Sequence, residues 1–328
     1  MIITNLFIFI SISFLFFILI CKFSYKLNLV DIPNKRKIHK TPVAYTGGIA
    51  LALTFVLSVY LFDFNHTKMN LIFTIGFLMA FVGFIDDKYN LNIGSKLSLQ
   101  IIPVVYLIIM EKFHLSHLGE YGFFQLQLNT FAIPFTLISV LFLINAYNYF
   151  DGLNGTLTFS SISVILILYF LVENENIRLF FIIILITKLI FLLFNFSIFK
   201  LQRLFLGDSG SMLLGFITSF ILIYLANEKK IDPILLAFSI SIFVYEFLSI
   251  NFIRLSKKKH LFTAGKDHLH HIVYKKYNSV ILTNLIIFTL NIIFFIFGYL
   301  SFKLINSLSA LILFIIFFFI YYSIRKKY

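Results

Sequence analysis

Residues 279–301, SVILTNLIIFTLNIIFFIFGYLS, contain no charged side chain. An α-helix needs about 20 mostly apolar residues to cross the hydrocarbon core of a bilayer. A helix that is apolar on every side is buried in a large protein or spans a membrane. The stretch therefore predicts a transmembrane helix.

The same criterion applied along the whole chain predicts eleven spans and an all-α, polytopic membrane fold. Segment 2–21 has neither a charged n-region nor a small-residue cleavage site, so we expect a retained helix rather than a signal peptide. No separate soluble domain is visible, and residues 1–328 are expected to form one integral membrane domain. The predicted spans are 2–21, 45–62, 69–85, 97–111, 131–148, 157–173, 178–199, 211–227, 233–254, 279–301 and 305–323.

Composition supports this interpretation. Apolar residues make up 60% of the chain and charged residues 12%, whereas a soluble domain has about 45–50% and about 25%. Cys21 is the only cysteine, which excludes disulfides within the chain and any thiolate metal site. Most of the apolar surface must therefore face lipid.

Lysine and arginine are distributed unevenly between the predicted loops. With the N-terminus outside, 20 of them fall on the inner side and six on the outer side, and Lys188 lies within a span. Positive charge gathers on the cytoplasmic side of membrane proteins. We therefore expect an outer N-terminus and a cytoplasmic C-terminus. The net charge of +13 indicates topology and affinity for phosphates or anionic headgroups rather than nucleic-acid binding.

The 14 acidic residues are segregated. Glu246 lies inside a predicted span, and seven others lie in or beside outer loops. The remaining six lie on the predicted inner face, at helix ends or in short motifs: Asp31, Asp86, Asp87, Asp151, Asp208 and Asp267. This segregation predicts a functional site at the cytoplasmic face.

Asp86 and Asp87 end the third span in GFIDDKYNL. Adjacent carboxylates repel each other, and a helix C-terminus carries partial negative charge. A divalent cation or a cluster of lysines would remove the conflict; a solvated pair at the membrane interface is the alternative. Neighbouring helical side chains diverge. We therefore expect unequal roles, one at a metal and lipid phosphate, the other serving structure or a lysine such as Lys96.

Two further motifs combine glycine with a carboxylate at the start of a predicted helix, NAYNYFDGLNG (145–155) and FLGDSGS (205–211). Free backbone N–H groups at a helix N-terminus favour phosphate, and a nearby aspartate can hold Mg²⁺ through oxygen. Each motif alone is also compatible with an ordinary N-cap and a glycine turn. Their occurrence on one predicted face favours the phosphate site.

The last inner loop, 255–278, contains GKDHLHH among lysines. If the loop is helical, His268 and His271 share a face and His270 points elsewhere. A zinc site would need a fourth ligand that the loop lacks, so a cationic phosphate cradle is the favoured interpretation. A solvated basic loop that only enforces topology is the alternative.

In order along the chain, these motifs and the loop DIPNKRKIHKTPVAYTGG (31–48) resemble the polyprenyl-phosphate N-acetylhexosamine-1-phosphate transferases, glycosyltransferase family 4. The resemblance covers residues 31–276. It implies transfer of a HexNAc-1-phosphate, most typically GlcNAc-1-phosphate, from a UDP-sugar to polyprenyl (undecaprenyl) phosphate, with release of UMP and Mg²⁺ or Mn²⁺ as cofactor. It also implies a bacterial inner membrane enzyme with a cytoplasmic active site, at the first membrane step of O-antigen or cell-wall glycan synthesis. A homodimer is left open.

The resemblance also implies roles for individual residues. It assigns Phe205 to packing against uracil. The catalytic residues that it implies are Asp86, Asp87, Asp208 and His268, with Asp208 and Asp87 at the metal. The substrate-binding residues that it implies are Lys40, Lys96, Asn148, Asp151, Asn154, Phe205, His270 and His271.

The chain departs from the family pattern at several positions. Asn154 stands where DGLDG has its second Asp, and Glu246 stands where many members have Asp. Val244 replaces a proline, which leaves the local helix shape open. Leu269 separates His268 from the next histidines, a form more like the GlcNAc-type enzymes than the phospho-MurNAc-pentapeptide translocase.

Two alternatives stay open. The translocase is the rival enzyme, and a membrane transporter is the rival of another class. Transporter sites concentrate near the bilayer midplane, whereas Lys188 and Glu246 are the only charges well inside the predicted spans. The sequence also leaves open the polyprenol, the polymer pathway, and a one-step or phospho-enzyme mechanism.

Overall fold

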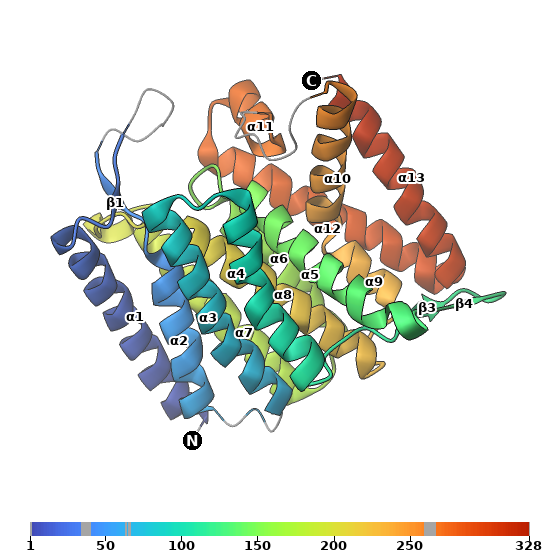
Figure 1. Cartoon of the computed structure of the whole chain (residues 1–328), viewed down its shortest axis with the longest axis horizontal. Helices are drawn as coiled ribbons and strands as arrows, with labels where there is room; N and C mark the ends of the chain where they lie inside the picture. Colours follow the sequence, from blue (N-terminus) through green and yellow to red (C-terminus); the bar gives the residue numbers. More distant parts are fainter. Residues whose placement is uncertain (1, 34–40, 63, 65–66, 259–266, 328) are drawn as a thin grey trace. The chain divides into compact units, whose positions relative to one another are not determined.

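The structure is a computed structural model that describes residues 2–33, 41–62, 64, 67–258 and 267–327. Regular structure in this part of the chain is almost entirely helical, as predicted (Figure 1). Strand β1 (Val30–Asp31) pairs antiparallel with β2 (Val43–Ala44), and β3 (His117–Glu120) pairs antiparallel with β4 (Gln125–Gln127). The chain forms two compact units. Unit 1 comprises Met1–Pro103 and Asn174–Thr218, and unit 2 comprises Val104–Glu173 and Ser219–Tyr328.

Each of the eleven predicted segments contains helix. Eight helical stretches of the described residues are long and apolar enough to cross a membrane. They are α1 (Ile2–Lys26), α3 (Thr67–Tyr89), α4 with η1 (Ile93–Val105 and Tyr106–Met110), η2 with α5 (Asn129–Phe131 and Ala132–Tyr149), α7 (Glu175–Asn195), α8 (Gly207–Asn227), α12 (Val280–Leu304) and α13 (Ser307–Lys326). The chain is a multi-pass membrane protein.

The remaining apolar segments differ from simple spans. Helices α9 (Pro233–Ser239) and α10 (Ser241–Ser256) would form a ninth span if counted together, but they are bent by 71°. Helices α2 (Gly47–Leu61) and α6 (Thr156–Leu171) are apolar but have only 15 and 16 residues. The count of eleven spans and the orientation of the termini therefore stay predictions. The short helices η3 (Ile198–Lys200) and α11 (Leu269–Tyr277) complete the fold.

In unit 1, α2 packs between α1 and α3, and α7 packs against α1 and α2 (Figure 1). Three buried phenylalanines stack in this core: the ring of Phe73 lies 4.7 Å from that of Phe55 and 4.3 Å from that of Phe180. Stacked aromatic rings bury large apolar areas and add a further favourable interaction. The stack therefore joins α2, α3 and α7.

Two glycines allow α2 and α3 to approach the start of α8. A Cβ atom at Gly48 would collide with the backbone of Gly210, and one at Gly83 would collide with the backbone of Asp208. Small residues at helix interfaces permit this backbone contact in membrane proteins. As a result, the ends of α2 and α3 lie directly beside the α8 N-terminus.

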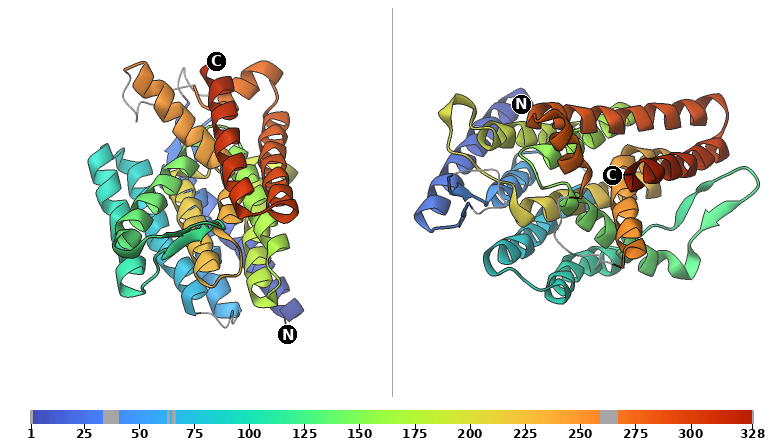
Figure 2. Two further views of the ribbon diagram at one scale, coloured as in Figure 1. Left: turned by 90° about the vertical axis from the view of Figure 1, so that its right-hand side faces the viewer. Right: turned by 90° about the horizontal axis from the view of Figure 1, so that it is seen from above.

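In unit 2, α12 packs against α6, α9 and α13, and α12 and α13 lie side by side (Figure 2). The bend between α9 and α10 falls at Ile240. Asn291 of α12 donates to the Ser239 carbonyl (2.9 Å) and accepts from the Ile242 N–H (3.3 Å). A side chain inserted at a helix break can satisfy the freed backbone groups. The segment predicted as span 233–254 is therefore bent, and Asn291 stabilises a bend that needs no proline at Val244.

Candidate functional site

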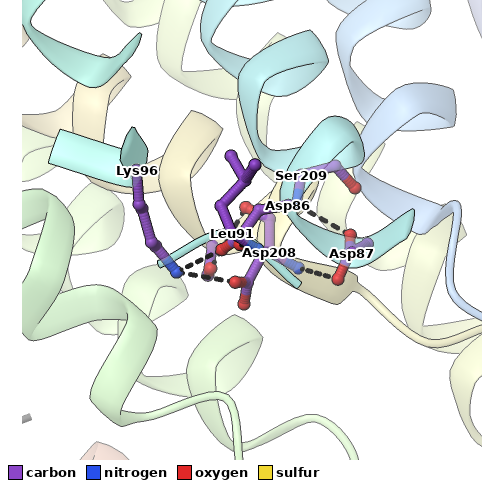
Figure 3. A network of polar contacts seen from close by, with 7 residues as sticks. Asp86, Asp87, Leu91, Lys96, Asp208 and Ser209 are labelled. Carbon is purple, nitrogen blue, oxygen red and sulfur yellow. Dashed lines mark hydrogen bonds and ion pairs between the residues drawn. The ribbon is translucent and has the colours of Figure 1, made fainter. Parts of the chain in front are cut away.

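The N-terminus of α8 is held by a carboxylate from another helix. Asp87, near the end of α3, accepts the N–H of Asp208 at Oδ1 (2.9 Å) and the N–H of Ser209 at Oδ2 (3.2 Å) (Figure 3). The first N–H groups of a helix have no partner within it, and the positive end of the helix dipole favours an anion there. Gly207 has a positive φ of 71°, and a Cβ there would lie 2.6 Å from Asp87 Oδ2. Glycine thus lets the Asp87 carboxylate reach the helix.

Lys96 of α4 joins the other two aspartates. Its Nζ lies 2.7 Å from Asp86 Oδ2 and 2.6 Å from Asp208 Oδ2 (Figure 3). Asp86 also accepts the Leu91 N–H at Oδ1 (3.0 Å). The side chain of Asp86 is 8% exposed, and that of Lys96 is 18% exposed, so water screens this cluster incompletely. The ammonium group therefore offsets part of the negative charge of two converging carboxylates.

The adjacent aspartates Asp86 and Asp87 have different neighbours, as their divergence on a helix predicts. Asp86 shares the ammonium of Lys96 with Asp208, whereas Asp87 binds the backbone of α8. The charge conflict expected at the end of α3 is relieved twice, by a lysine and by a helix N-terminus. The catalytic roles of the two residues stay predictions.

The cluster has the donor chemistry that Mg²⁺ prefers. Oxygens of Asp86 and Asp208 already converge on one cation, and Mg²⁺ is bound by one or two carboxylates together with water and phosphate oxygens. Among the described residues, no group of three or more His, Cys, Asp or Glu side chains is arranged to hold a metal. A metal here would thus need ligands from water and substrate. In the structure, Asp208 and Asp86 converge on the ammonium group of Lys96. The sequence-based prediction instead named Asp208 and Asp87 as the metal ligands.

The loop before α2 and the loop before α8 are paired in unit 1. Phe205 donates its N–H to the Ala44 carbonyl (2.7 Å) and accepts from the Gly47 N–H (2.9 Å). A Cβ at Gly47 would lie 2.5 Å from the Phe205 carbonyl oxygen, so glycine permits this contact. The motifs VAYTGG and FLGDSG therefore form one backbone unit, with the Phe205 ring half-buried beside it. Lys40 lies outside the described residues.

In unit 2, the loop between α5 and α6 meets the histidine motif. A Cβ at Gly152 would collide with Nε2 of His270, so this loop and α11 are in direct contact. Asp151 and Asn154 are half-buried in the same loop, and Asn148 is half-buried in the last turn of α5. The Asn154 carbonyl accepts a hydrogen bond from Asn284 of α12 (2.8 Å). The structure thus brings NAYNYFDGLNG and GKDHLHH together within unit 2.

The three histidines form a continuous group. The rings of His268 and His270 are parallel within 3° at 5.7 Å, and the ring of His271 lies 4.2 Å from that of His270. His268 is the N-cap of α11 and has extended backbone. The expectation that His270 points away from the other two assumed a helix that includes His268, and it does not apply because His268 lies outside the helix.

Burial lowers the pKa of His268 to about 4 and holds the pKa of His270 well below its usual range. Both imidazoles are therefore neutral at pH 7, so the positive charge of the predicted cradle would come from its lysines. Nδ1 of His268 and Nε2 of His270 are buried and have no hydrogen-bond partner in the described part of the chain. Buried polar atoms are normally satisfied, so these two nitrogens fit a bound ligand or water.

Relatives of this chain come from several bacteria. It is 28% identical to the undecaprenyl-phosphate alpha-N-acetylglucosaminyl 1-phosphate transferase of Salmonella typhi over 269 residues, 80% of this chain and 73% of the relative. The corresponding protein of Escherichia coli (strain K12) is 26% identical over 77% of this chain and 71% of its own. The probable undecaprenyl-phosphate N-acetylglucosaminyl 1-phosphate transferase of Bacillus subtilis (strain 168) is 28% identical over 75% of this chain and 70% of its own.

The family model described as glycosyl transferase family 4 matches residues 69–226, a range that contains Asp86, Asp87, Lys96 and Asp208. The chain thus matches glycosyl transferase family 4 over just under half of its length. This match confirms the resemblance expected from the motifs. The matched range contains Gly152, whose neighbour is His270, and ends before the histidine motif itself.

Sequence reasoning missed several residues around the histidines. Arg254 binds Asp267 through two hydrogen bonds, and Arg325 binds Glu246 through two more. Both arginines had counted only as positive charges that orient the chain. Their burial would have been the useful signal, since a buried arginine requires a partner, but burial is not visible in the sequence.

Proposed function

We propose that this chain transfers N-acetylhexosamine 1-phosphate, with GlcNAc as the sugar, from a UDP-sugar to undecaprenyl phosphate at the cytoplasmic face of the inner membrane. The observation that carries the proposal is the convergence of Asp86 and Asp208 on Lys96 at the N-terminus of α8. Three curated relatives whose names state such a transferase activity support the proposal, as does the match to the family 4 model.

In the proposed reaction, an oxygen of the lipid phosphate forms a bond to the phosphorus that carries the sugar. The bond from that phosphorus to the oxygen of the UMP group breaks, so the products are the lipid diphosphate sugar and UMP. The reactants bring several negative charges together, and such reactions depend on positioning and charge neutralisation. Lys96 supplies one positive charge, and the α8 N-terminus supplies a further partial charge. Mg²⁺ held by Asp208 and Asp86 supplies the remaining neutralisation when it is bound.

The other predicted site residues keep their proposed roles. Asn148, Asp151, Asn154 and Phe205 serve the nucleoside, and His268, His270 and His271 contact the diphosphate. Because His268 and His270 are neutral, they act as hydrogen-bonding groups. The lysines of the same loop are proposed to supply the positive charge. Lys40 is proposed as a further contact with substrate.

The test is an assay of purified protein in detergent with undecaprenyl phosphate and a panel of radiolabelled UDP-HexNAc donors. Label that becomes lipid-extractable, with one UMP released per transfer, supports the proposal. Transfer only from UDP-MurNAc-pentapeptide would identify the translocase instead. Uptake into proteoliposomes without lipid labelling would favour the transporter. Asp208→Ala should abolish transfer, whereas Glu175→Ala, which removes an exposed carboxylate from the start of α7, should leave it unchanged.

The cytoplasmic location has a separate test. Cys21 is the only native cysteine, so Cys21→Ser provides a background for single-cysteine labelling. We expect Lys326→Cys to react with a membrane-impermeant thiol reagent only after the cells are opened. Labelling in intact cells would overturn the proposed orientation.

A further inference from the structure

A buried ionic network joins α13 to α10 in unit 2. Glu246 is 1% exposed, and its carboxylate accepts from Arg325 Nε at Oε2 (2.8 Å) and from Arg325 Nη2 at Oε1 (2.9 Å). The Tyr321 hydroxyl donates to Oε2 as well (2.7 Å). This two-pronged contact matches the fork of the guanidinium group to the carboxylate and fixes its orientation.

The same carboxylate holds the start of the histidine helix. Leu269, the first residue of α11, donates its N–H to Glu246 Oε1 (2.7 Å). His268 occupies the N-cap position but makes no side-chain cap, so Glu246 performs that function from another helix. An anion at this end of α11 is also favoured by the helix dipole.

The residue before His268 is fixed by the same arginine. Nη2 of Arg325 donates to the Asp267 carbonyl oxygen (2.5 Å), and Arg254 of α10 binds the Asp267 carboxylate. Burial raises the pKa of the Asp267 carboxyl, but the Arg254 guanidinium outweighs this effect and holds that pKa below its usual value. The backbone on both sides of His268 is therefore tied to buried charges of α10 and α13.

We propose that Arg325 and Tyr321 of the C-terminal helix are positioning residues, which act through Glu246 to set the start of α11 and hence the imidazoles of His268 and His270. The catalytic consequence rests on the proposed function. The positional consequence does not. The network leaves neither charge alone in the interior, where an unpaired charge strongly destabilises a protein.

The first experiment compares Arg325→Ala with Lys326→Ala, which removes the same charge from the exposed neighbouring position. Hydrogen–deuterium exchange is followed in a peptide spanning residues 267–273. We expect exchange about 10- to 100-fold faster in the Arg325 variant, the range that corresponds to loss of hydrogen bonds to a charged group, and unchanged exchange in the Lys326 variant. Equal protection in both variants would overturn the proposal.

Activity provides the second readout. In the Arg325→Ala enzyme, KM for the UDP-sugar should rise about tenfold or more, while KM for the lipid phosphate stays within about twofold. Arg325→Lys should raise KM for the UDP-sugar less than Arg325→Ala does, because lysine keeps the positive charge but lacks the forked guanidinium group. A fall in kcat alone, with both KM values and local exchange unchanged, would contradict the positioning role.

A double variant separates positioning from folding. Glu246→Met with Arg325→Met removes both buried charges, and such replacements are often neutral or stabilising. It still deprives the Leu269 N–H of its acceptor. We expect a protein that inserts normally, yet shows fast exchange at 267–273 and a raised KM for the UDP-sugar. Wild-type exchange in this variant would overturn the proposal. If the double variant exchanges fast at 267–273 but the wild type shows no transfer, the proposed function is wrong and the positioning role is still supported.

Discussion

The backbone N–H of Asp208 donates a hydrogen bond of 2.9 Å to Oδ1 of Asp87, a residue 121 positions earlier in the chain. Asp87 thereby caps α8, while its neighbour Asp86 shares the ammonium of Lys96 with the Asp208 side chain. Both adjacent carboxylates thus act on the start of α8. Asp87 binds its backbone, and Asp86 reaches the Asp208 side chain through Lys96. Their substitutions should therefore have different effects.

Asp87→Asn should lower stability more than Asp86→Asn does. The amide keeps one acceptor for two N–H groups and loses the charge, and loss of a helix cap costs about 0.5–2 kcal/mol. Asp86→Asn should instead lower kcat by about 10²–10³, as for loss of one electrostatic stabiliser. Thermal unfolding in detergent and steady-state kinetics on both variants are the measurements. Equal effects of the two changes on both quantities would show that the pair acts as one unit.

Lys96→Met should make the protein more dependent on Mg²⁺. Without the ammonium, the carboxylates of Asp86 and Asp208 repel each other, and a divalent cation would relieve the repulsion. We expect a lower Tm without metal and a larger rise in Tm on adding Mg²⁺ than in the wild type. Lys88→Met, at an exposed position beside Asp87, is the matched control and should behave like the wild type. An unchanged Mg²⁺ response in the Lys96 variant would argue against a cation site here.

Gly152→Ala should displace His270, because the added methyl group would collide with the imidazole. Overpacking of this kind typically costs about 1–3 kcal/mol. Gly94→Ala is the control, since the nearest atom to a Cβ there is 3.4 Å away. The double variant Gly152→Ala with His270→Ala should recover the Tm of His270→Ala alone, as a double-mutant cycle requires for a direct contact. If the two substitutions instead lower Tm additively, the strain in Gly152→Ala does not come from contact with His270.

Stability should fall as the pH is lowered from about 6.5 toward 4. Burial depresses the pKa of His268 to about 4 and that of His270 well below its usual value, whereas both are near 6.5 in the unfolded chain. The unfolded state therefore binds more protons in this window, and stability rises with pH until about 6.5. His270→Gln should flatten the dependence of Tm on pH between 7.5 and 5.5. A variant with the wild-type slope would show that other groups set it.

Much of the fold follows from the sequence alone. Long uncharged stretches such as 279–301, repeated along a chain of this size, indicate helices in lipid, and each predicted span does contain helix. The motifs around Asp86, Asp151, Asp208 and His268 were visible because so few polar residues interrupt the apolar chain. Composition and periodicity could not predict the shape of residues 233–256, because the bend there depends on Asn291 from a distant helix.

The tertiary structure decided which partner each charged residue has. Lys96 contacts Asp208 across 112 positions, and Arg325 contacts Glu246 across 79, so no local pattern encodes either pair. The sequence determined that these charges occur near helix ends and in an apolar interior, where they need partners. Packing then selected the partners, because glycines at 48, 83, 152 and 207 let backbones and side chains approach closely enough for particular donors and acceptors to meet. The physical reason is the short range of hydrogen bonds, which follow tertiary proximity and not sequence order.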